Sequence, residues 1–254
     1  EIIILLEEMK EKDRYIRTLL GVKLDCIQKA QVLSKIVGWL KEDRKRYVVT
    51  PNPEMLVEAQ KDEEFRQILN KADMAILDGV GLVWALKWKG VKGIKRVAGA
   101  DVMSDLIKRA NQYNKKVYLL GGSFGVVEKA KKVLKNKYPK LKIKAEAGPF
   151  DITKTTKNQN QILHRKINKF KPDLLFVAFG HQKQEKWIAD NLDKLKIKVA
   201  MGVGGSFDYL VKPWLRAPKM IQKMGFEWLW RLMLQPWRIK RQFGLLKFVG
   251  LVLK

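Results

Sequence analysis

The chain has 254 residues, and its 52 Lys and Arg outnumber its 26 Asp and Glu, so the formal net charge is +26. With 46% hydrophobic residues it is too apolar for a disordered basic tail, and its length fits one main domain with a smaller appendage. One cysteine and two histidines exclude a disulfide framework and a Cys/His zinc cluster, and the apolar runs are shorter than the roughly 20 residues that a membrane-spanning helix needs.

The N-terminal segment, residues 1–17 (EIIILLEEMKEKDRYIR), is predicted to be an extra amphipathic helix. It lacks the basic start and the small-residue cleavage site of a signal peptide. We therefore expect a protein of the reducing cytoplasm.

From residue 47 onward, short apolar runs alternate with helical patterns, which is typical of an α/β fold. Continuous apolar strands are buried on both faces by crossover helices, so we expect a mainly parallel, Rossmann-like sheet with flanking helices. The expected strands are Tyr47–Thr50, Met74–Asp78, Val117–Leu120, Leu141–Ala145, Leu174–Phe179 and Val199–Val203.

Asp78 directly follows one of these strands and precedes Gly79, where the backbone can turn sharply. Ligands of parallel sheets bind beyond the carboxyl ends of the strands, where a carboxylate can serve as a general base. Asp is equally a favoured N-cap for the helix expected after it. Position alone leaves both roles open.

Two glycine-rich turns between a strand and a helix could bring backbone N–H groups to a phosphate. The first, GGSFG, contains Gly121 and Gly122, but its spacing is not the G-x-G-x-x-G of a dinucleotide site. The second, GVGGSFD, contains Gly204, Gly205 and Asp208, whose carboxylate could accept hydrogen bonds from ribose hydroxyls. Either turn could also be a plain tight turn with a helix cap.

The C-terminal stretch 212–254 holds ten Lys or Arg against one acid, Glu227, together with four of the eight Trp. Cations interleaved with Trp suggest a segment that binds an anionic membrane surface. The Lys elsewhere, such as those of residues 129–137, fit an ordinary solvated surface. We therefore divide the chain into the extra helix 1–17, an α/β domain 18–211 and a membrane-associating C-terminal appendage 212–254.

Eight motifs in chain order resemble those of the WecG/TagA/CpsF glycosyltransferases, glycosyltransferase family 26. They are Thr50–Glu54 (TPNPE), Asp78–Gly81 (DGVG), Arg96–Gly99 (RVAG), Lys183–Trp187 (KQEKW), Gly202–Asp208 (GVGGSFD), Arg216–Pro218 (RAP), Gly225–Leu232 (GFEWLWRL) and Gln235–Arg238 (QPWR). Two positions differ from the pattern: Val80 replaces a small polar residue, and His181-Gln182 replace an Ala-Pro pair.

The resemblance implies an inverting, metal-independent enzyme without a cofactor, peripheral to the inner face of the bacterial plasma membrane. It implies transfer of a sugar, typically N-acetylmannosamine, from its UDP donor to undecaprenyl-diphosphate-linked GlcNAc in wall teichoic acid type polymers. The implied residues are the base Asp78; Thr50, Asn52, Arg96 and Gln184 in the sugar and acceptor pocket; Gly204, Gly205 and Asp208 at the nucleotide; and Arg231, Arg238 and Arg241 from the appendage.

The residues agree with this chemistry, because an inverting transfer needs one base and the chain has no D-x-D motif to hold a metal. Protein cations must then stabilise the leaving diphosphate, and arginines pair with phosphate bidentately. The alternatives are another UDP-sugar donor such as glucose or a uronic acid, a Rossmann-type oxidoreductase with Glu146 as the ribose acid, and a basic nucleic-acid-binding protein. No nucleic-acid motif supports the last, and homo-oligomerisation is left open.

Overall fold

The computed structural model describes residues 15–149 and 151–253, without the side chains of residues 238 and 240–242. Its centre is a six-stranded sheet, in which every neighbouring pair of strands is parallel. This confirms the predicted α/β class with a Rossmann-like sheet. In sheet order the strands are β4 (Met74–Ala75), β3 (Arg46–Val49), β8 (Val199–Gly202), β7 (Leu174–Ala178), β5 (Lys116–Gly121) and β6 (Lys142–Glu146).

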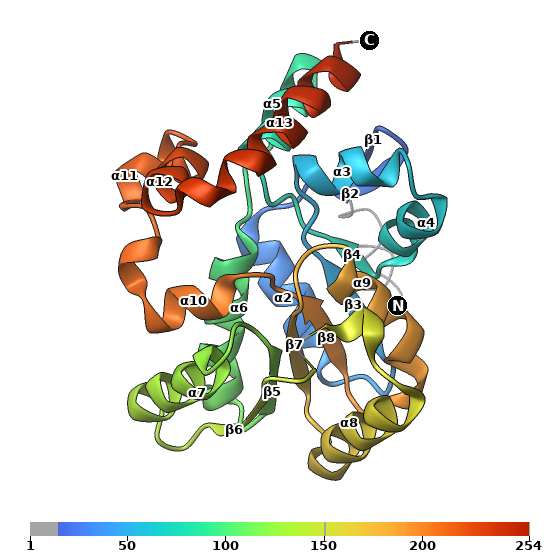
Figure 1. Ribbon diagram of the computed structural model, residues 1–254, viewed down its shortest axis with the longest axis vertical. Coiled ribbons are helices and arrows are strands. Elements are labelled where there is room, and N and C mark those ends of the chain that lie inside the picture. Colours follow the sequence, from blue (N-terminus) through green and yellow to red (C-terminus); the bar gives the residue numbers. More distant parts are fainter. Residues whose placement is uncertain (1–14, 150, 254) are drawn as a thin grey trace, which may run out of the picture.

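Helices cover both faces of the sheet, and each face has its own hydrophobic core (Figure 1). The side chains of β7 are buried throughout, as expected for a central strand of a parallel sheet. One face carries α3 (Pro53–Ala59), α4 (Glu63–Lys71), α5 (Val80–Trp88), α8 (Lys157–Phe170) and α9 (Lys183–Asn191). The other carries α2 (Lys29–Trp39), α6 (Gly99–Gln112), α7 (Val126–Lys137) and α10 (Ser206–Val211).

A two-stranded antiparallel hairpin, β1 (Ile16–Leu19) and β2 (Val22–Asp25), precedes this domain. Its last residue, Asp25, bridges to Ile76 and accepts a hydrogen bond from the N–H of Ala75 at 2.8 Å. The hairpin therefore protects β4, which is the edge strand of the sheet.

The hairpin corrects the N-terminal expectation, because Ile16 and Arg17 lie in β1 and not in an extra helix. These two residues pair with Asp25 and Leu24 of β2, so their backbone hydrogen bonds are those of a sheet and not of a helix. Residues 1–14, the rest of that expected helix, lie outside the described residues.

The chain after α10 forms short helices that end in one longer helix (Figure 1). Pro236 interrupts the chain between the last two α-helices, because proline cannot donate a helical hydrogen bond. The long helix packs on α3 and α5 and buries Phe248 and Val252 completely or nearly so. These elements are η3 (Pro213–Leu215), α11 (Lys219–Lys223), α12 (Glu227–Leu234), η4 (Pro236–Arg238) and α13 (Ile239–Val252).

Candidate active site

The carboxyl ends of the parallel strands meet at one edge of the sheet, and the residues expected to act there follow those ends. Thr50 follows β3, Asp78 follows β4, Gly122 follows β5, and Gly204 follows β8. The topology therefore brings together side chains and turns that are far apart in the sequence.

Asp78 is held by three hydrogen bonds to its two carboxylate oxygens. Arg96 donates to Oδ1 from Nη2 at 3.1 Å and from Nε at 3.3 Å, and the N–H of Gly99 donates to Oδ2 at 3.0 Å. The N-cap of α5 is Gly79 and not Asp78. The carboxylate is thus oriented by Arg96 and by the first turn of α6, and it does not cap the helix that follows it.

Burial is the main influence on the Asp78 carboxyl, and it raises the pKa above the ordinary value. The positive charge of Arg96 and the bond from Gly99 act in the opposite direction and favour the ionised form. The side chain remains 25% exposed, so a substrate hydroxyl can reach it. These features suit a carboxylate that accepts a proton, because a raised pKa makes it a stronger base.

Arg96 connects Asp78 to the C-terminal segment. Its Nη1 donates to Oε2 of Glu227 on α12 at 2.8 Å, and Glu227 is only 7% exposed. Burial alone would lower the pKa of Arg96, but the charges of Asp78 and Glu227 outweigh burial and raise it. Arg96 is therefore a fixed cation between two carboxylates, and Glu227 is a site residue that the sequence reasoning did not select.

Glu227 also lies 3.6 Å from Nε of Arg216, whose Nη2 pairs with Asp101 at 2.8 Å. The motifs RVAG, RAP and GFEWLWRL are thus joined in one charged network. The signal for Glu227 was present in the sequence, since it is the only acid of residues 212–254.

Thr50 and Asn52 flank Asp78 from the β3–α3 loop. Thr50 donates from Oγ1 to the carbonyl of Gly202 at 3.3 Å, and a Cβ on Gly99 would lie 2.8 Å from its methyl group. Asn52 is the N-cap of α3, where its Oδ1 accepts from the N–H of Met55 at 3.0 Å. Thr50 therefore lies beside the base, while the oxygen of Asn52 is occupied by the cap.

Gln184 is 3% exposed and fixes the glycine turn after β8. Its Oε1 accepts from the N–H of Gly204 at 3.0 Å, and its Nε2 donates to Oε1 of Glu185 at 2.7 Å. A Cβ on Gly202 would lie 2.8 Å from both side chains, so only glycine fits there. Both polar atoms of the Gln184 amide thus have protein partners. Gln184 would therefore act on a substrate by holding the glycine turn in place.

Glu185 is fully buried, and burial raises its pKa to about 7. Among the described residues its Oε2 has no hydrogen-bond partner. A protonated carboxyl is therefore the form that suits this position near neutral pH.

The two glycine-rich turns contact each other. A Cβ on Gly122 would lie 3.2 Å from the ring of Phe207, which belongs to the GVGGSFD turn. Gly121 and Gly122 both have φ near +90°, a region that favours glycine, and a Cβ on Gly121 would lie 2.8 Å from the carbonyl of Ala178. The two turns expected at the nucleotide thus lie next to each other, and the ring of Phe207 joins them into one surface.

Arg231 reaches this surface from α12. A Cβ on Gly205 would lie 3.3 Å from Oδ2 of Asp208 and 3.6 Å from Nη2 of Arg231. Arg231 donates to the hydroxyl of Tyr209 at 2.9 Å, and its guanidinium lies over that ring. A carboxylate and a guanidinium therefore stand side by side at the second turn. Arg238 and Arg241, expected at the same site, lie outside the residues whose side chains are described.

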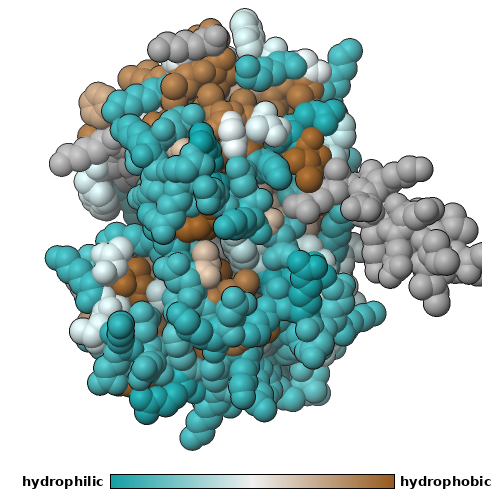
Figure 2. All heavy atoms as spheres, turned by 90° about the vertical axis from the view of Figure 1, so that its right-hand side faces the viewer, coloured by the Kyte–Doolittle hydropathy of each residue, from teal (hydrophilic) through white to brown (hydrophobic). Residues whose placement is uncertain are grey.

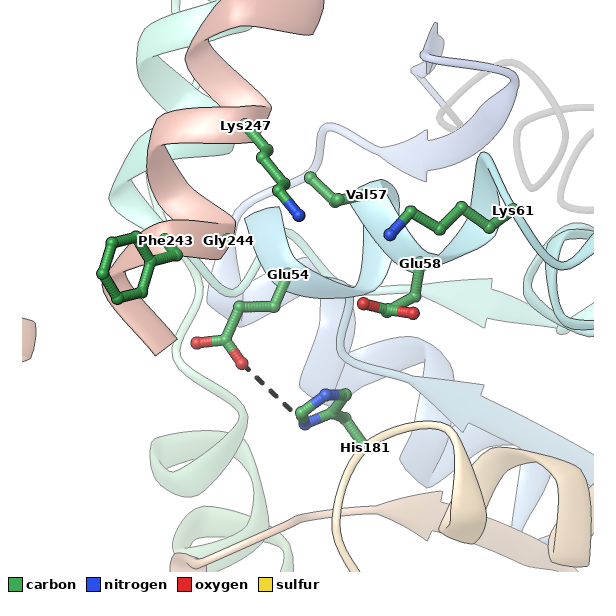
Figure 3. Close-up of a pocket in the computed structure, with 8 residues that line it drawn as sticks. All are labelled: Glu54, Val57, Glu58, Lys61, His181, Phe243, Gly244 and Lys247. Carbon is green, nitrogen blue, oxygen red and sulfur yellow. Dashed lines mark ion pairs between the residues drawn. The ribbon is translucent and has the colours of Figure 1, made fainter. Parts of the chain in front are cut away.

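A separate cleft of about 290 Å³ lies between α3, the turn after β7 and α13 (Figure 3). Glu54 and His181 face each other across it, with His181 Nδ1 3.9 Å from Glu54 Oε2. Lys61 and Lys247 point into it from opposite sides, and Phe243 of α13 is among the residues that line it. His181 belongs to one of the two places where the chain differs from the motif pattern; the other, Val80, does not line this cleft.

No group of three or more His, Cys, Asp and Glu side chains in residues 15–149 and 151–253 has the arrangement of a metal site. Among the helices of the same described part, none has the length and apolar character needed to cross a bilayer.

The family model described as "Glycosyl transferase WecG/TagA/CpsF family" matches residues 17–254. An N-acetylglucosaminyldiphosphoundecaprenol N-acetyl-beta-D-mannosaminyltransferase of Staphylococcus aureus (strain NCTC 8325 / PS 47) is 30% identical over 225 residues, which are 88% of this chain and 86% of that protein. A protein of the same name from Bacillus subtilis (strain 168) is 29% identical over 240 residues, covering 94% of this chain and 88% of its own.

Proposed function

Because this chain belongs to the WecG/TagA/CpsF glycosyltransferase family, we propose that it transfers N-acetylmannosamine from a UDP donor to GlcNAc-diphosphoundecaprenol, with inversion at the transferred sugar. Membership in the family confirms the resemblance read from the motifs and makes the chain a glycosyltransferase. The choice of sugar and acceptor is supported by the names of the two relatives. Use of the product in a wall teichoic acid type polymer remains part of the proposal.

The observation that carries the proposal is the Asp78 carboxylate, fixed by Arg96 and Gly99 at the carboxyl edge of the sheet. In the proposed reaction one of its oxygens accepts the proton of the acceptor hydroxyl. The hydroxyl oxygen attacks the anomeric carbon from the face opposite UDP, the bond between that carbon and the diphosphate oxygen breaks, and UDP leaves. The three hydrogen bonds leave the carboxylate little freedom, so it is positioned before the substrate arrives. Thr50 lies next to it and would contact the sugar.

UDP would leave along the two glycine turns. The glycines at 121, 122, 204 and 205 would let a diphosphate approach the backbone closely. The N–H of Gly122 already donates to the carbonyl of Ala178 at 2.8 Å and that of Gly204 to Gln184 at 3.0 Å, so the phosphate oxygens would meet the N–H of Gly205 and the permanent positive charge of Arg231 beside it. Asp208 would accept from the ribose. Arg238 and Arg241 stay proposed as further cations for the diphosphate.

The acceptor is a lipid, so the enzyme must work at a membrane surface. We propose that it lies on the inner face of the plasma membrane and that residues 212–254 contact anionic lipid. The support is their charge and the exposure of Trp214 and Trp237, which are 63% and 71% exposed. The same segment supplies Glu227 to the site, so docking and site assembly would be coupled.

The test is an assay of the purified protein with GlcNAc-diphosphoundecaprenol and a panel of UDP sugars, with the product identified by mass and by the configuration of the new bond. We expect a product only with UDP-N-acetylmannosamine, at the same rate in EDTA. Transfer of glucose or a uronic acid instead would contradict the proposed donor sugar but not the membership in the family. Turnover that stops in EDTA and returns with Mg²⁺ would contradict the role of the arginines.

A further inference from the structure

Helix α5 exposes two tryptophans on one face. Trp84 and Trp88 are four residues apart, 41% and 66% exposed, and their rings stack at a centroid distance of 6.1 Å. The opposite side of the helix, including Leu82 and Leu86, is buried in the core. Large exposed aromatic pairs are uncommon on soluble surfaces and indicate an interaction site.

The tryptophans are surrounded by positive charge. Lys87, Lys89 and Lys92 are exposed, and the sequence has no acid between Asp78 and Asp101. Within the described residues none of the three has a carboxylate within 4.0 Å. We call Trp84, Trp88 and these three lysines the α5 face.

The α5 face is continuous with the exposed side of α13. The two helices pack together, with Gly81 against Leu245 and Phe248, and they rise side by side above the sheet in Figure 1. Phe243 and Leu246 of α13 are 62% and 69% exposed. Figure 2 shows hydrophobic side chains at the end of the molecule where these helices lie, while the lower part of this face is mostly hydrophilic.

We propose that the α5 face is a second membrane-docking element, in addition to residues 212–254, and that it inserts its tryptophans at the surface of an anionic bilayer. Indole rings favour the interface between headgroups and acyl chains, and the flanking lysines favour anionic headgroups. This inference concerns the α/β domain itself and rests on the proposed function only for its consequence in catalysis.

A second copy of the chain is a poorer occupant of the same face. Two copies joined by it would bring at least three lysines of each copy together without an acid of the α5 face between them. An anionic lipid surface pairs with the same charges favourably. The charge pattern therefore selects lipid.

The position of α5 explains why docking here would matter. The helix begins at Val80, two residues after Asp78, and its nine residues span about 13 Å. The α5 face would hold Asp78 at a fixed height of that order above the headgroups. A diphosphate-linked sugar that projects from the bilayer needs the base at such a height.

The experiment measures sedimentation of the full chain with vesicles of phosphatidylglycerol and phosphatidylcholine. We expect Trp84→Ser/Trp88→Ser to weaken binding about a hundredfold, at about tenfold for each tryptophan. Lys87→Gln/Lys89→Gln/Lys92→Gln should weaken it by about fivefold for each lysine and should abolish the preference over pure phosphatidylcholine. All five side chains are exposed, and thermal unfolding will verify that the variants fold.

The matched control is Lys129→Gln/Lys131→Gln/Lys132→Gln, which removes the same charge from exposed positions of α7. We expect it to bind vesicles as the unaltered protein does. Equal losses in the control and in the α5 lysine variant would overturn the proposal, since binding would then follow net charge alone. Unaltered vesicle binding of the tryptophan variant would also overturn it, as would a dimer in solution that this variant alone disrupts.

A second readout separates this inference from the proposed function. The tryptophan variant should keep its turnover on a water-soluble GlcNAc-diphosphate acceptor and lose it on the acceptor embedded in vesicles. Unaltered protein that binds vesicles through the α5 face but transfers no sugar to either acceptor would reject the proposed function and leave the docking element standing.

Discussion

Asp78 is the residue on which the proposed chemistry depends. We expect Asp78→Asn to lower turnover by about 10²- to 10⁴-fold, because the amide keeps the shape but cannot accept a proton. UDP affinity, measured by calorimetry, should stay within a few fold. Nearly full activity of this variant would show that another residue is the general base, and Asp101 would be the next candidate.

Glu227 adjusts that base through Arg96. In Glu227→Gln the negative charge near Asp78 is removed, and Arg96 is left with Asp78 as its charged partner. Because Glu227 raises the pKa of Asp78, its loss should shift the acidic limb of the pH–rate profile to lower pH. Turnover should fall about ten- to a hundredfold through poorer positioning. The exposed Glu128→Gln serves as the control, and an unshifted acidic limb would show that Glu227 acts on stability alone.

Glu185 predicts a pH dependence of stability. Its pKa is raised from the ordinary 4.5 to about 7, so the folded state binds more protons than the unfolded state between these values. The free energy of unfolding should therefore fall as pH rises through this window, by an amount on the order of 3 kcal/mol, and level off above it. Urea unfolding on both sides of the window should show this fall in the unaltered protein and a smaller one in Glu185→Gln. An undiminished fall would assign the titration to another group.

At the residue scale, the sequence predicted where the expected site residues lie better than it predicted their hydrogen-bond partners; their roles stay predictions. Asp78, Thr50 and Gly204 lie at strand ends as expected, because apolar runs mark where parallel strands stop. The bond from Gln184 to Gly204 and the ion pair of Arg96 with Glu227 join residues 20 and 131 positions apart. Such pairings depend on tertiary structure, and no local pattern encodes them.

At the scale of elements, the sequence predicted a strand, turn or break only where a local residue pattern marks it. The hairpin β1–β2 was missed because its turn, Leu20-Gly21, lacks the Asn-Gly or Asp-Gly signature, although both residues have positive φ. Strand β4 was expected to extend to Asp78, but its ladder ends at Ala75, and Ile76 instead forms a bridge with Asp25. Pro236, in contrast, marks a break between α12 and α13 that depends only on the residue itself, because proline has no N–H to donate to a helix.

The C-terminal helix α13 is attached through its buried side chains and not through the tryptophans of the segment. Phe248 is completely buried against the core, whereas Phe243 on the same helix is 62% exposed. We expect Phe248→Ala to lower the free energy of unfolding by about 3–5 kcal/mol through the cavity that it leaves. Phe243→Ala should change it by about 0.5 kcal/mol or less. Both values come from denaturant unfolding, and equal effects would contradict the packing of α13.

At the scale of the whole molecule, Figure 2 shows hydrophobic side chains gathered at one end of the face in view. The helices α5 and α13 lie at this end in Figure 1. Glu227, Arg231 and the α13 helix all come from the segment that carries ten cations and one acid. The proposed catalytic geometry and the proposed attraction to lipid would thus depend on the same part of the chain.

This arrangement predicts a different salt response for two acceptors. Salt screens charges that act across water, shortening the screening length from about 10 Å at 0.1 M to about 3 Å at 1 M, while the close ion pairs around Asp78 are screened much less. Turnover on vesicle-embedded acceptor should therefore fall about tenfold or more as salt is added, because attraction to the anionic surface is lost. Turnover on a water-soluble acceptor should change little over the same range. Vesicles of phosphatidylcholine alone are the control, on which the salt dependence should be weak. Equal salt sensitivity with both acceptors would place the effect in the active site, and the +26 charge would then have no role in bringing the enzyme to the membrane.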